Sequence, residues 1–309
     1  MSLLSQKHLQ DEEAAYAWVE ARVWPEGPVC PHCQGKERIS KMQGKATRFG
    51  LYKCYACRKQ FRVTVNTIFE KSHVPLYLWL QAFYLIAGSK KGISSNQLHR
   101  TLGVTLKTAW FMGHRIREAM RVGSLAPPMG GAGEIVEVDE TFIGNNGRYK
   151  MFWKMRGNQH KHVVLTLVQR NGGARSFHVE RASAREIIPL VQANIDKETS
   201  IATDEAKHYS TLKNEFAAHR TVNHSRKEYV RGKVHTNTVE GYFSIFKRGM
   251  RGVYQHCGER HLHRYLAEFD FRYSNRIALG VNDEARAAKA VEGVVGKRLT
   301  YRTTGSRAQ

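Results

Sequence analysis

The sequence predicts a multidomain α+β protein, in which a small cysteine-rich domain and a helical region precede an α/β domain. Two Cys-x-x-Cys pairs lie within residues 30–57, and apolar side chains recur at helical spacing over residues 76–120. From residue 134 onward, segments with strand-like alternation are interspersed with helical segments. A glycine- and proline-rich stretch at residues 123–133 is the predicted linker between the helical region and the α/β domain.

The four cysteines predict a structural zinc site. Cys30, Cys33, Cys54 and Cys57 form two pairs separated by twenty residues, a spacing at which four thiolates can bind one Zn²⁺ tetrahedrally. Short strands predicted nearby, at residues 38–40, 49–53 and 60–63, complete a zinc ribbon over residues 26–70. Two disulfides or a redox-active pair are the alternatives, and a cytosolic chain disfavours the disulfides. Cys257 stands alone and is expected to be an ordinary free thiol.

Residues 71–122 predict a helix-turn-helix. Ser94 and Thr105 are expected to cap two helices, and Gly103 lies in the turn between them. The predicted DNA-contacting residues lie on the exposed face of the second of these helices: Lys107, Thr108 and Arg115. An ordinary helical hairpin with solvated charges is the alternative.

The net charge points to a polyanionic partner. The chain has 49 Lys and Arg against 27 Asp and Glu, a formal net charge of +22. Because the basic residues are spread along the chain instead of forming one amphipathic helix, nucleic acid is favoured over a membrane surface. The absence of a long apolar stretch or a signal peptide predicts a soluble intracellular protein. The alternative at this point is a ribosome-associated or merely basic protein.

The α/β domain is predicted over residues 134–280. Strands are expected at residues 134–142, 161–169, 174–179, 200–204 and 221–224. Helices are expected at residues 182–195, 206–216, 235–251 and 259–276. Three strands, helix, strand, helix, strand and helix is the element order of an RNase H-like fold. Residues 1–25 are assigned to an N-terminal helix and residues 281–309 to a basic C-terminal tail.

Three carboxylates fall at positions that such a fold brings together. Asp139 is near the end of the first strand, Asp204 ends the fourth, and Glu240 lies on the helix after the fifth. Three converging carboxylates repel one another unless cations neutralise them. Two Mg²⁺ or Mn²⁺ ions bound there can support in-line displacement at phosphorus. Glu140 and Glu205 follow the two aspartates directly, point the other way, and are not expected to be ligands.

These motifs resemble those of the DDE transposases of the IS1595 family, the group with an ISXO2-like transposase domain. The resemblance rests on the cysteine pairs, residues 138–144 (VDETFIG), 203–205 (TDE), 235–249 (HTNTVEGYFSIFKRG) and 269–276 (FDFRYSNR). It implies a prokaryotic, cytoplasmic, nucleoid-associated enzyme that binds the terminal inverted repeats of its own insertion sequence. The enzyme would cleave double-stranded DNA there and join the 3′-hydroxyl ends to target DNA, acting as a homodimer or higher assembly.

The third catalytic position remains open between two residues. The family is described with Asn or Glu at this position, and Asn237 and Glu240 are three apart on one predicted helix. We favour Glu240 as the metal ligand and Asn237 as a residue that orients water or DNA. Lys247 lies two turns further on the same face and is expected to contact a phosphate, with Arg248 as a further DNA contact. His235 is either a cap or a DNA contact.

Two other classes of function compete with a transposase. One is an RNase H-like nuclease or resolvase that cleaves without joining, and the other is a catalytically silent DNA-binding regulator. The DNA-binding front region and the presence of all three acids favour the transposase. A covalent mechanism would need a nucleophile such as Tyr242 or Tyr273, which the helical pattern assigns to other roles.

Overall fold

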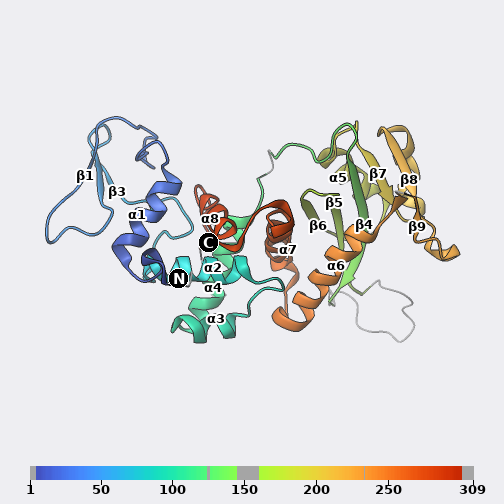
Figure 1. Cartoon of the computed structure of the whole chain (residues 1–309). Coiled ribbons are helices and arrows are strands. Elements are labelled where there is room, and N and C mark those ends of the chain that lie inside the picture. The colour runs from blue at the N-terminus through green and yellow to red at the C-terminus, as the bar shows by residue number, and fades with distance from the viewer. Residues whose placement is uncertain (1–4, 124–125, 145–159, 233, 301–309) are drawn as a thin grey trace, which may run out of the picture. The chain divides into compact units, whose positions relative to one another are not determined.

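The chain divides into two units in a computed structural model that describes residues 5–123, 126–144, 160–232 and 234–300 (Figure 1). Unit 1 comprises Met1–Arg121 and Asn282–Gln309, and unit 2 comprises Val122–Val281. Parts of the predicted linker (residues 124–125) and of the predicted tail (residues 301–309) lie outside the described residues. In the part of the chain that is described, no helix is long and apolar enough to span a bilayer.

Unit 1 begins with a helix and a small antiparallel sheet. The 3₁₀ helix η2 (Lys7–Leu9) and helix α1 (Glu12–Val23) precede the strands β1 (Ile39–Lys41), β2 (Tyr52–Cys54) and β3 (Gln60–Phe61). The strands pair in the order β1-β2-β3, with Ile39 opposite Cys54 and Tyr52 opposite Phe61. The Tyr52 and Phe61 rings stack with centroids 5.8 Å apart, and Trp24 packs edge-on against both. This aromatic cluster is the small apolar core beside the cysteines.

Three helices follow the sheet, and the two that were predicted to be capped by Ser94 and Thr105 have these caps. The three helices are α2 (Leu76–Gly88), α3 (Ser95–Leu102) and α4 (Leu106–Met120). The Ser94 hydroxyl accepts from the Gln97 N–H and the Thr105 hydroxyl accepts from the Thr108 N–H, which are N-cap bonds. Gly103 ends α3 at φ +66°, a left-handed conformation that favours glycine. Short polar residues therefore mark the helix boundaries in this region.

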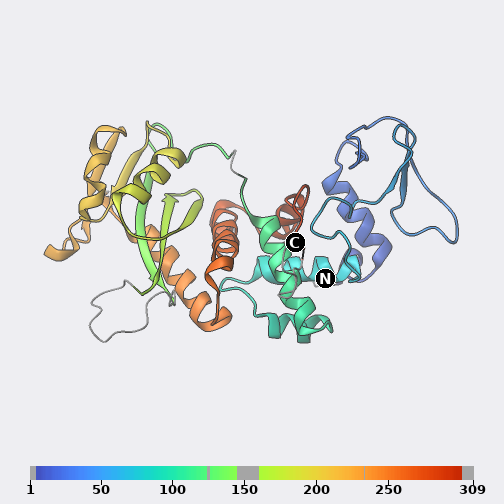
Figure 2. The same ribbon diagram turned by 180° about the vertical axis from the view of Figure 1, so that it is seen from behind.

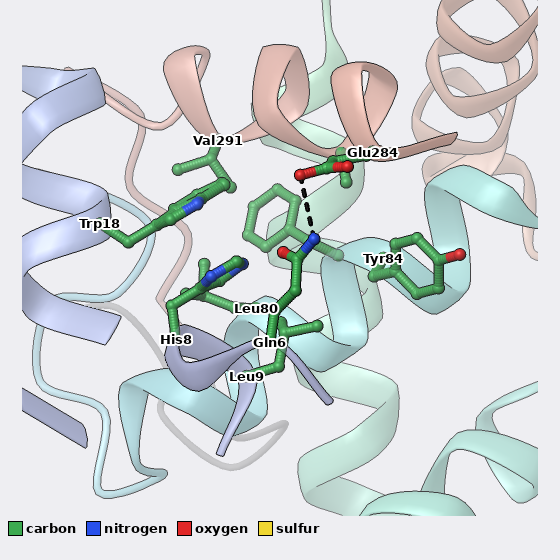
Figure 3. A pocket seen from close by; sticks show the side chains of 10 residues that line it. Gln6, His8, Leu9, Trp18, Leu80, Tyr84, Glu284 and Val291 are labelled. Carbon is green, nitrogen blue, oxygen red and sulfur yellow. Dashed lines mark hydrogen bonds between the residues drawn. The ribbon is translucent and has the colours of Figure 1, made fainter. Parts of the chain in front are cut away.

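The segment assigned from sequence to a basic tail instead forms part of unit 1. Helix α8 (Asp283–Glu292) buries Ala287, Ala290 and Val291, and the Arg286 guanidinium donates to the Ala87 carbonyl at 3.2 Å. Figure 3 shows Val291 of α8 beside Trp18 of α1, and the Gln6 side chain donating a hydrogen bond to Glu284 of α8. Alanines and a valine at spacings of three and four give α8 an apolar face despite its charged ends.

Unit 2 contains a five-stranded mixed sheet with the order β6-β5-β4-β7-β8. Its strands are β4 (Ile135–Ile143), β5 (His162–Gln169), β6 (Ala174–Val179), β7 (Ser200–Thr203) and β8 (Ala218–Thr221). The first three pair antiparallel, whereas β7 pairs parallel to both β4 and β8. The first and fourth strands of the domain are therefore neighbours, as the sequence predicts.

Helices cover both faces of this sheet (Figure 1 and, from behind, Figure 2). The helices of unit 2 are α5 (Ala184–Asn194), α6 (Asn237–Gly249), continued by the π-helical turn η5 (Met250–Tyr254), and α7 (Glu259–Ser274). Shorter elements are η3 (Lys207–Asn214), η4 (His224–Arg226), η6 (Ile277–Leu279) and the hairpin β9 (Val230–Arg231) with β10 (Val234–His235). One core lies between the sheet and α6 and α7, and the other lies between the sheet, α5 and η3.

Two elements of unit 2 differ from the sequence prediction. The segment expected as an α-helix at residues 206–216 is a 3₁₀ helix, in which the buried side chains Tyr209 and Leu212 are three residues apart. A spacing of three places both side chains on one face of a 3₁₀ helix, which has three residues per turn. The fifth strand occupies Ala218–Thr221, earlier than the predicted residues 221–224.

Candidate active site

Asp139 and Asp204 come together where β7 ends beside the middle of β4, because β4 and β7 run parallel. Glu137 on β4 pairs with Ala202 on β7, so the two aspartates each follow that pair by two residues. Asp139 is still within β4, and Asp204 directly follows β7. The register alone therefore places the two carboxylates side by side.

The electrostatics of Asp139 show that the acids act on one another. Burial raises the pKa of Asp139 to about 8, and the charges of Glu140, Asp204 and Glu240 add to this shift. The Glu140 N–H donates to the Asp139 carboxylate at 2.7 Å and opposes the shift. Burial also raises the pKa of Asp204. A half-buried group of repelling carboxylates is a favourable place for a divalent cation with oxygen ligands.

Glu240 lies at the rim of this acidic group. Its side chain is 49% exposed, and it accepts from the Thr236 hydroxyl at 2.9 Å, with the His224 Nε2 atom 3.9 Å away. Among the described residues, Asp139, Asp204 and Glu240 do not form a group whose ligand atoms all lie within 4.8 Å of one another. Glu240 would therefore have to turn away from Thr236 to share an ion with the aspartates.

The remaining predicted residues of α6 differ in their surroundings. Asn237 is the first residue of α6 and is exposed, as is Arg248. Lys247 is half-buried, and burial followed by the charge of Arg251 lowers its pKa, whereas Asp139 acts in the opposite direction. Lys247 thus lies within the electrostatic field of Asp139.

Glu137 is a site residue that the sequence analysis missed. It is fully buried on β4, two residues before Asp139 and on the same face of the strand. Its carboxylate accepts from the N–H groups of Thr238 and Val239 at 2.8 and 3.0 Å and from the Thr238 hydroxyl at 2.8 Å. Arg170 pairs with it at 2.6 Å and also donates to the His235 carbonyl.

Glu137 therefore caps the start of α6 from a different element. The residue preceding α6, Thr236, provides no side-chain cap for this helix. A carboxylate at the N-terminus of a helix satisfies its free N–H groups and interacts favourably with the helix dipole. His235, predicted as a cap or a DNA contact, lies with its Nδ1 atom 3.2 Å from Glu137. The N–H groups that Glu137 caps, those of Thr238 and Val239, are about a hundred residues away in sequence. Local sequence patterns therefore could not reveal this role of Glu137.

Glu140 and Glu205 are bonded to groups outside the acidic triad. Glu140 accepts from the Tyr209 hydroxyl at 2.6 Å, and His208 Nε2 lies 2.8 Å from the same oxygen. The bond with Glu140 raises the pKa of His208, and the charges of Asp204 and Asp139 add to the shift. Glu205 accepts from Ser225 and the His224 N–H, and these bonds lower its pKa to about 2. His208 is thus a second residue near the aspartates that the sequence analysis missed.

The four cysteines of unit 1 meet with the geometry of a zinc site. The Sγ atoms of Cys30 and Cys57 are 3.6 Å apart and those of Cys33 and Cys54 are 3.7 Å apart. All four lie within 4.8 Å of one another. A tetrahedral zinc ion with bonds of about 2.3 Å holds its sulfurs about 3.8 Å apart. The cluster therefore fits one structural Zn²⁺, and the five cysteines form no disulfide.

One predicted DNA contact is placed wrongly by the sequence analysis. Arg115 is only 6% exposed, and its guanidinium donates to the carbonyls of Ile68, Glu70 and Leu299. The helical pattern places Arg115 on a polar face of α4. The loop that contains Ile68 and Glu70 and the C-terminal segment that contains Leu299 cover this residue. Lys107 is exposed in the first turn of α4, and Thr108 is half-buried beside its cap.

Comparisons with known proteins relate both units of the chain to transposases. Residues 131–274 match the ISXO2-like transposase domain, and residues 10–60 match the transposase zinc-ribbon domain. The chain is 29% identical over 266 residues to an uncharacterized protein in transposable element ISH50 of Halobacterium salinarum, covering 81% of this chain and 86% of that protein. The cysteine cluster lies within the part that matches the zinc-ribbon domain, and the acidic group lies within the part that matches the transposase domain.

Proposed function

Because this chain carries the zinc-ribbon and transposase domains of the IS1595 family, we propose that it mobilises its own insertion sequence. It would bind the terminal inverted repeats, hydrolyse the phosphodiester at each end, and join the freed 3′-hydroxyls to target DNA. The observation that carries the proposal is the register of the parallel strands β4 and β7, which brings Asp139 on β4 close to Asp204 just after β7, within the part that matches the transposase domain. The similarity to a protein in a transposable element agrees with it.

The sheet order supports an RNase H-like catalytic domain. Three antiparallel strands followed by two parallel strands, with helices on both faces, match the element order expected of that fold. The helices α3 and α4, joined through Gly103, support a helix-turn-helix in unit 1. We propose that Lys107 and Thr108, at the start of α4, contact the DNA ends.

Asp139, Asp204 and Glu240 are proposed to hold two Mg²⁺ or Mn²⁺ ions, which would activate the nucleophile and neutralise charge on the leaving oxygen. Glu137 bonds to the first turn of α6 from β4, which supports a role in positioning Glu240 and Asn237 relative to the aspartates. Lys247 is proposed to bind a phosphate beside the cleaved bond. Arg248, which is exposed, is proposed as a further DNA contact.

A covalent tyrosine mechanism is poorly supported by the surroundings of both candidate nucleophiles. Tyr242 is 3% exposed, and its hydroxyl donates to the buried Asp270 carboxylate at 2.6 Å. Tyr273 packs edge-on against Tyr242, and the Arg276 guanidinium covers its ring at 4.1 Å. The Tyr242 hydroxyl is therefore buried and already bonded, and the half-buried Tyr273 ring is held by packing contacts.

The test uses purified full-length protein with labelled duplexes that carry the inverted repeats flanking its own reading frame. We expect cleavage that requires Mg²⁺ or Mn²⁺ and leaves a 3′-hydroxyl, followed by strand transfer into a second duplex. Cleavage without transfer would identify a nuclease, and binding without cleavage would identify a regulator. Protein–DNA adducts that survive denaturation, or full activity in chelator, would contradict the proposed chemistry.

A further inference from the structure

A second cluster of metal-ligating side chains lies in unit 2, apart from the acidic group. His162 is the first residue of β5, His178 lies near the end of β6, and Glu259 is the first residue of α7. One ligand atom from each of the three residues lies within 4.8 Å of the other two. The two imidazole rings have centroids 5.2 Å apart and planes inclined at 71°. Three separate elements therefore direct two nitrogens and one oxygen toward one point.

The strand register explains why the two histidines meet. Val164 pairs with His178, so His162, two residues before Val164, lies diagonally across from His178 on the same face. Helix α7 packs on this face and runs along β6: the Ser274 hydroxyl accepts from the Ala174 N–H, and the Asp270 carboxylate accepts from Ser176. Continuing this direction brings the first turn of α7 to the end of the strand that carries His178.

This cluster is separate from the carboxylates that are proposed to hold the catalytic metal ions. Ile143 pairs with His162, whereas Asp139 pairs with Thr166, four residues along the ladder. At a rise of about 3.3 Å per residue, the two sites are about 13 Å apart. An ion at one site would therefore share no ligand with an ion at the other.

The ligand chemistry favours a transition metal over magnesium. Two imidazoles and one carboxylate form a set of three protein ligands that binds tetrahedral zinc with a fourth position for water. Imidazole suits zinc, copper and nickel, whereas magnesium prefers an all-oxygen shell. Zinc with bonds of about 2.1 Å holds its ligands about 3.4 Å apart, so side chains that already lie within 4.8 Å need only small movements. The partial positive charge at the start of α7 and the charge of exposed Arg260 repel a cation. The negative charge of the Glu259 carboxylate offsets this repulsion.

We propose that His162, His178 and Glu259 bind a second zinc ion, which joins the start of α7 to the β5–β6 edge of the sheet. The C-terminal half of α7 is held to β6 by hydrogen bonds that the Asp270 carboxylate and the Ser274 hydroxyl accept from backbone N–H groups of the strand. The ion would supply the matching attachment at the other end of the helix. This proposal does not depend on the proposed transposase activity.

The test is metal analysis of full-length protein from which any histidine tag has been removed. After equilibration with excess Zn²⁺ and exchange into buffer containing Mg²⁺, we expect two zinc ions per chain. His178→Gln and Glu259→Gln should each lower the content from two to one, and Cys54→Ser should remove the other ion. His261→Ala, on the same turn of α7, and Asp139→Asn, in the acidic group, are matched controls that should keep two.

Cobalt substitution identifies which site has been lost. Co²⁺ bound to four thiolates gives intense charge-transfer bands, whereas a site of two histidines and one carboxylate gives only weak visible bands. In the His178→Gln variant, the weak bands should disappear while the thiolate bands remain. The thiolate bands also report that the variant has folded around its ribbon. One zinc per chain in the wild-type protein would overturn the proposal, whatever the variants do, as would a second zinc that persists in both variants.

Discussion

At the scale of single residues, the most direct prediction concerns Asp139 and Asp204. Asp139→Asn and Asp204→Asn each remove a charge from the proposed metal site while changing little in shape. Cleavage should fall to about one-hundredth or less if these carboxylates hold the ions that activate the nucleophile. Affinity for end DNA, measured by fluorescence anisotropy, should stay within about threefold of wild type. A variant that still cleaves at the wild-type rate would remove that aspartate from the active site.

The choice between Glu240 and Asn237 is also settled at this scale. If Glu240 is a ligand, Glu240→Gln should abolish turnover, whereas Asn237→Ala should only slow it, by about tenfold. Cleavage over a range of Mn²⁺ concentrations provides the readout: excess Mn²⁺ should restore measurable cleavage only in Glu240→Gln, because a lost ligand weakens metal binding, whereas Asn237→Ala should need as much Mn²⁺ as wild type. The reverse order of effects would assign the third position to Asn237.

At the scale of elements, Glu137 links β4 to α6. Glu137→Gln leaves Arg170 without its carboxylate partner and should lower the free energy of unfolding by about 3 kcal/mol, measured by urea denaturation. Because the start of α6 loses its cap, the maximal cleavage rate should fall more than the affinity for DNA.

Two variants control this experiment. Removing both charges, in Glu137→Gln/Arg170→Gln, should recover part of the lost stability, because no buried charge is then unpaired. Glu134→Gln changes an exposed acid near the start of the same strand and should leave stability unchanged. A Glu137→Gln variant as stable as wild type would show that this carboxylate does not hold the helix.

The elements also show which features the sequence could predict. Alternation places β4 and β5 correctly, and the caps Ser94 and Thr105 place α3 and α4, because these signals are local. The helix expected at residues 206–216 is 3₁₀ because burial of Tyr209 and Leu212 outweighs the preference for an α-helix. Arg115 was assigned to DNA because its helical face looks polar. Its burial depends on segments distant in sequence.

At the scale of the whole molecule, the chain leaves unit 1 after Arg121 and returns to it at Asn282. Gly293, just after α8, approaches α4 so closely that an added Cβ would lie 2.3 Å from the Ala119 carbonyl oxygen. Gly293→Ala should therefore destabilise unit 1 by about 1–3 kcal/mol, measured by thermal unfolding. Gly123→Ala, where an added Cβ meets nothing within 4 Å, is the control and should have little effect. Equal melting temperatures for Gly293→Ala and Gly123→Ala would contradict the close contact between Gly293 and α4.

The return of the chain also determines which fragment can bind DNA on its own. A fragment that stops at residue 124 lacks α8 and exposes the surface that Ala287, Ala290 and Val291 cover. It should aggregate or melt early, whereas residues 1–121 joined to residues 282–300 by a flexible linker should fold and bind zinc.

The joined fragment should bind end DNA without cleaving it, and its affinity should fall steeply with salt because phosphate contacts release counterions. Calorimetry and anisotropy on both fragments, with random DNA as the competitor, provide the measurement. If the short fragment is as stable as the joined one, α8 is dispensable for unit 1. If the joined fragment folds but does not distinguish end DNA from random DNA, specificity must come from unit 2 or from a second copy of the chain.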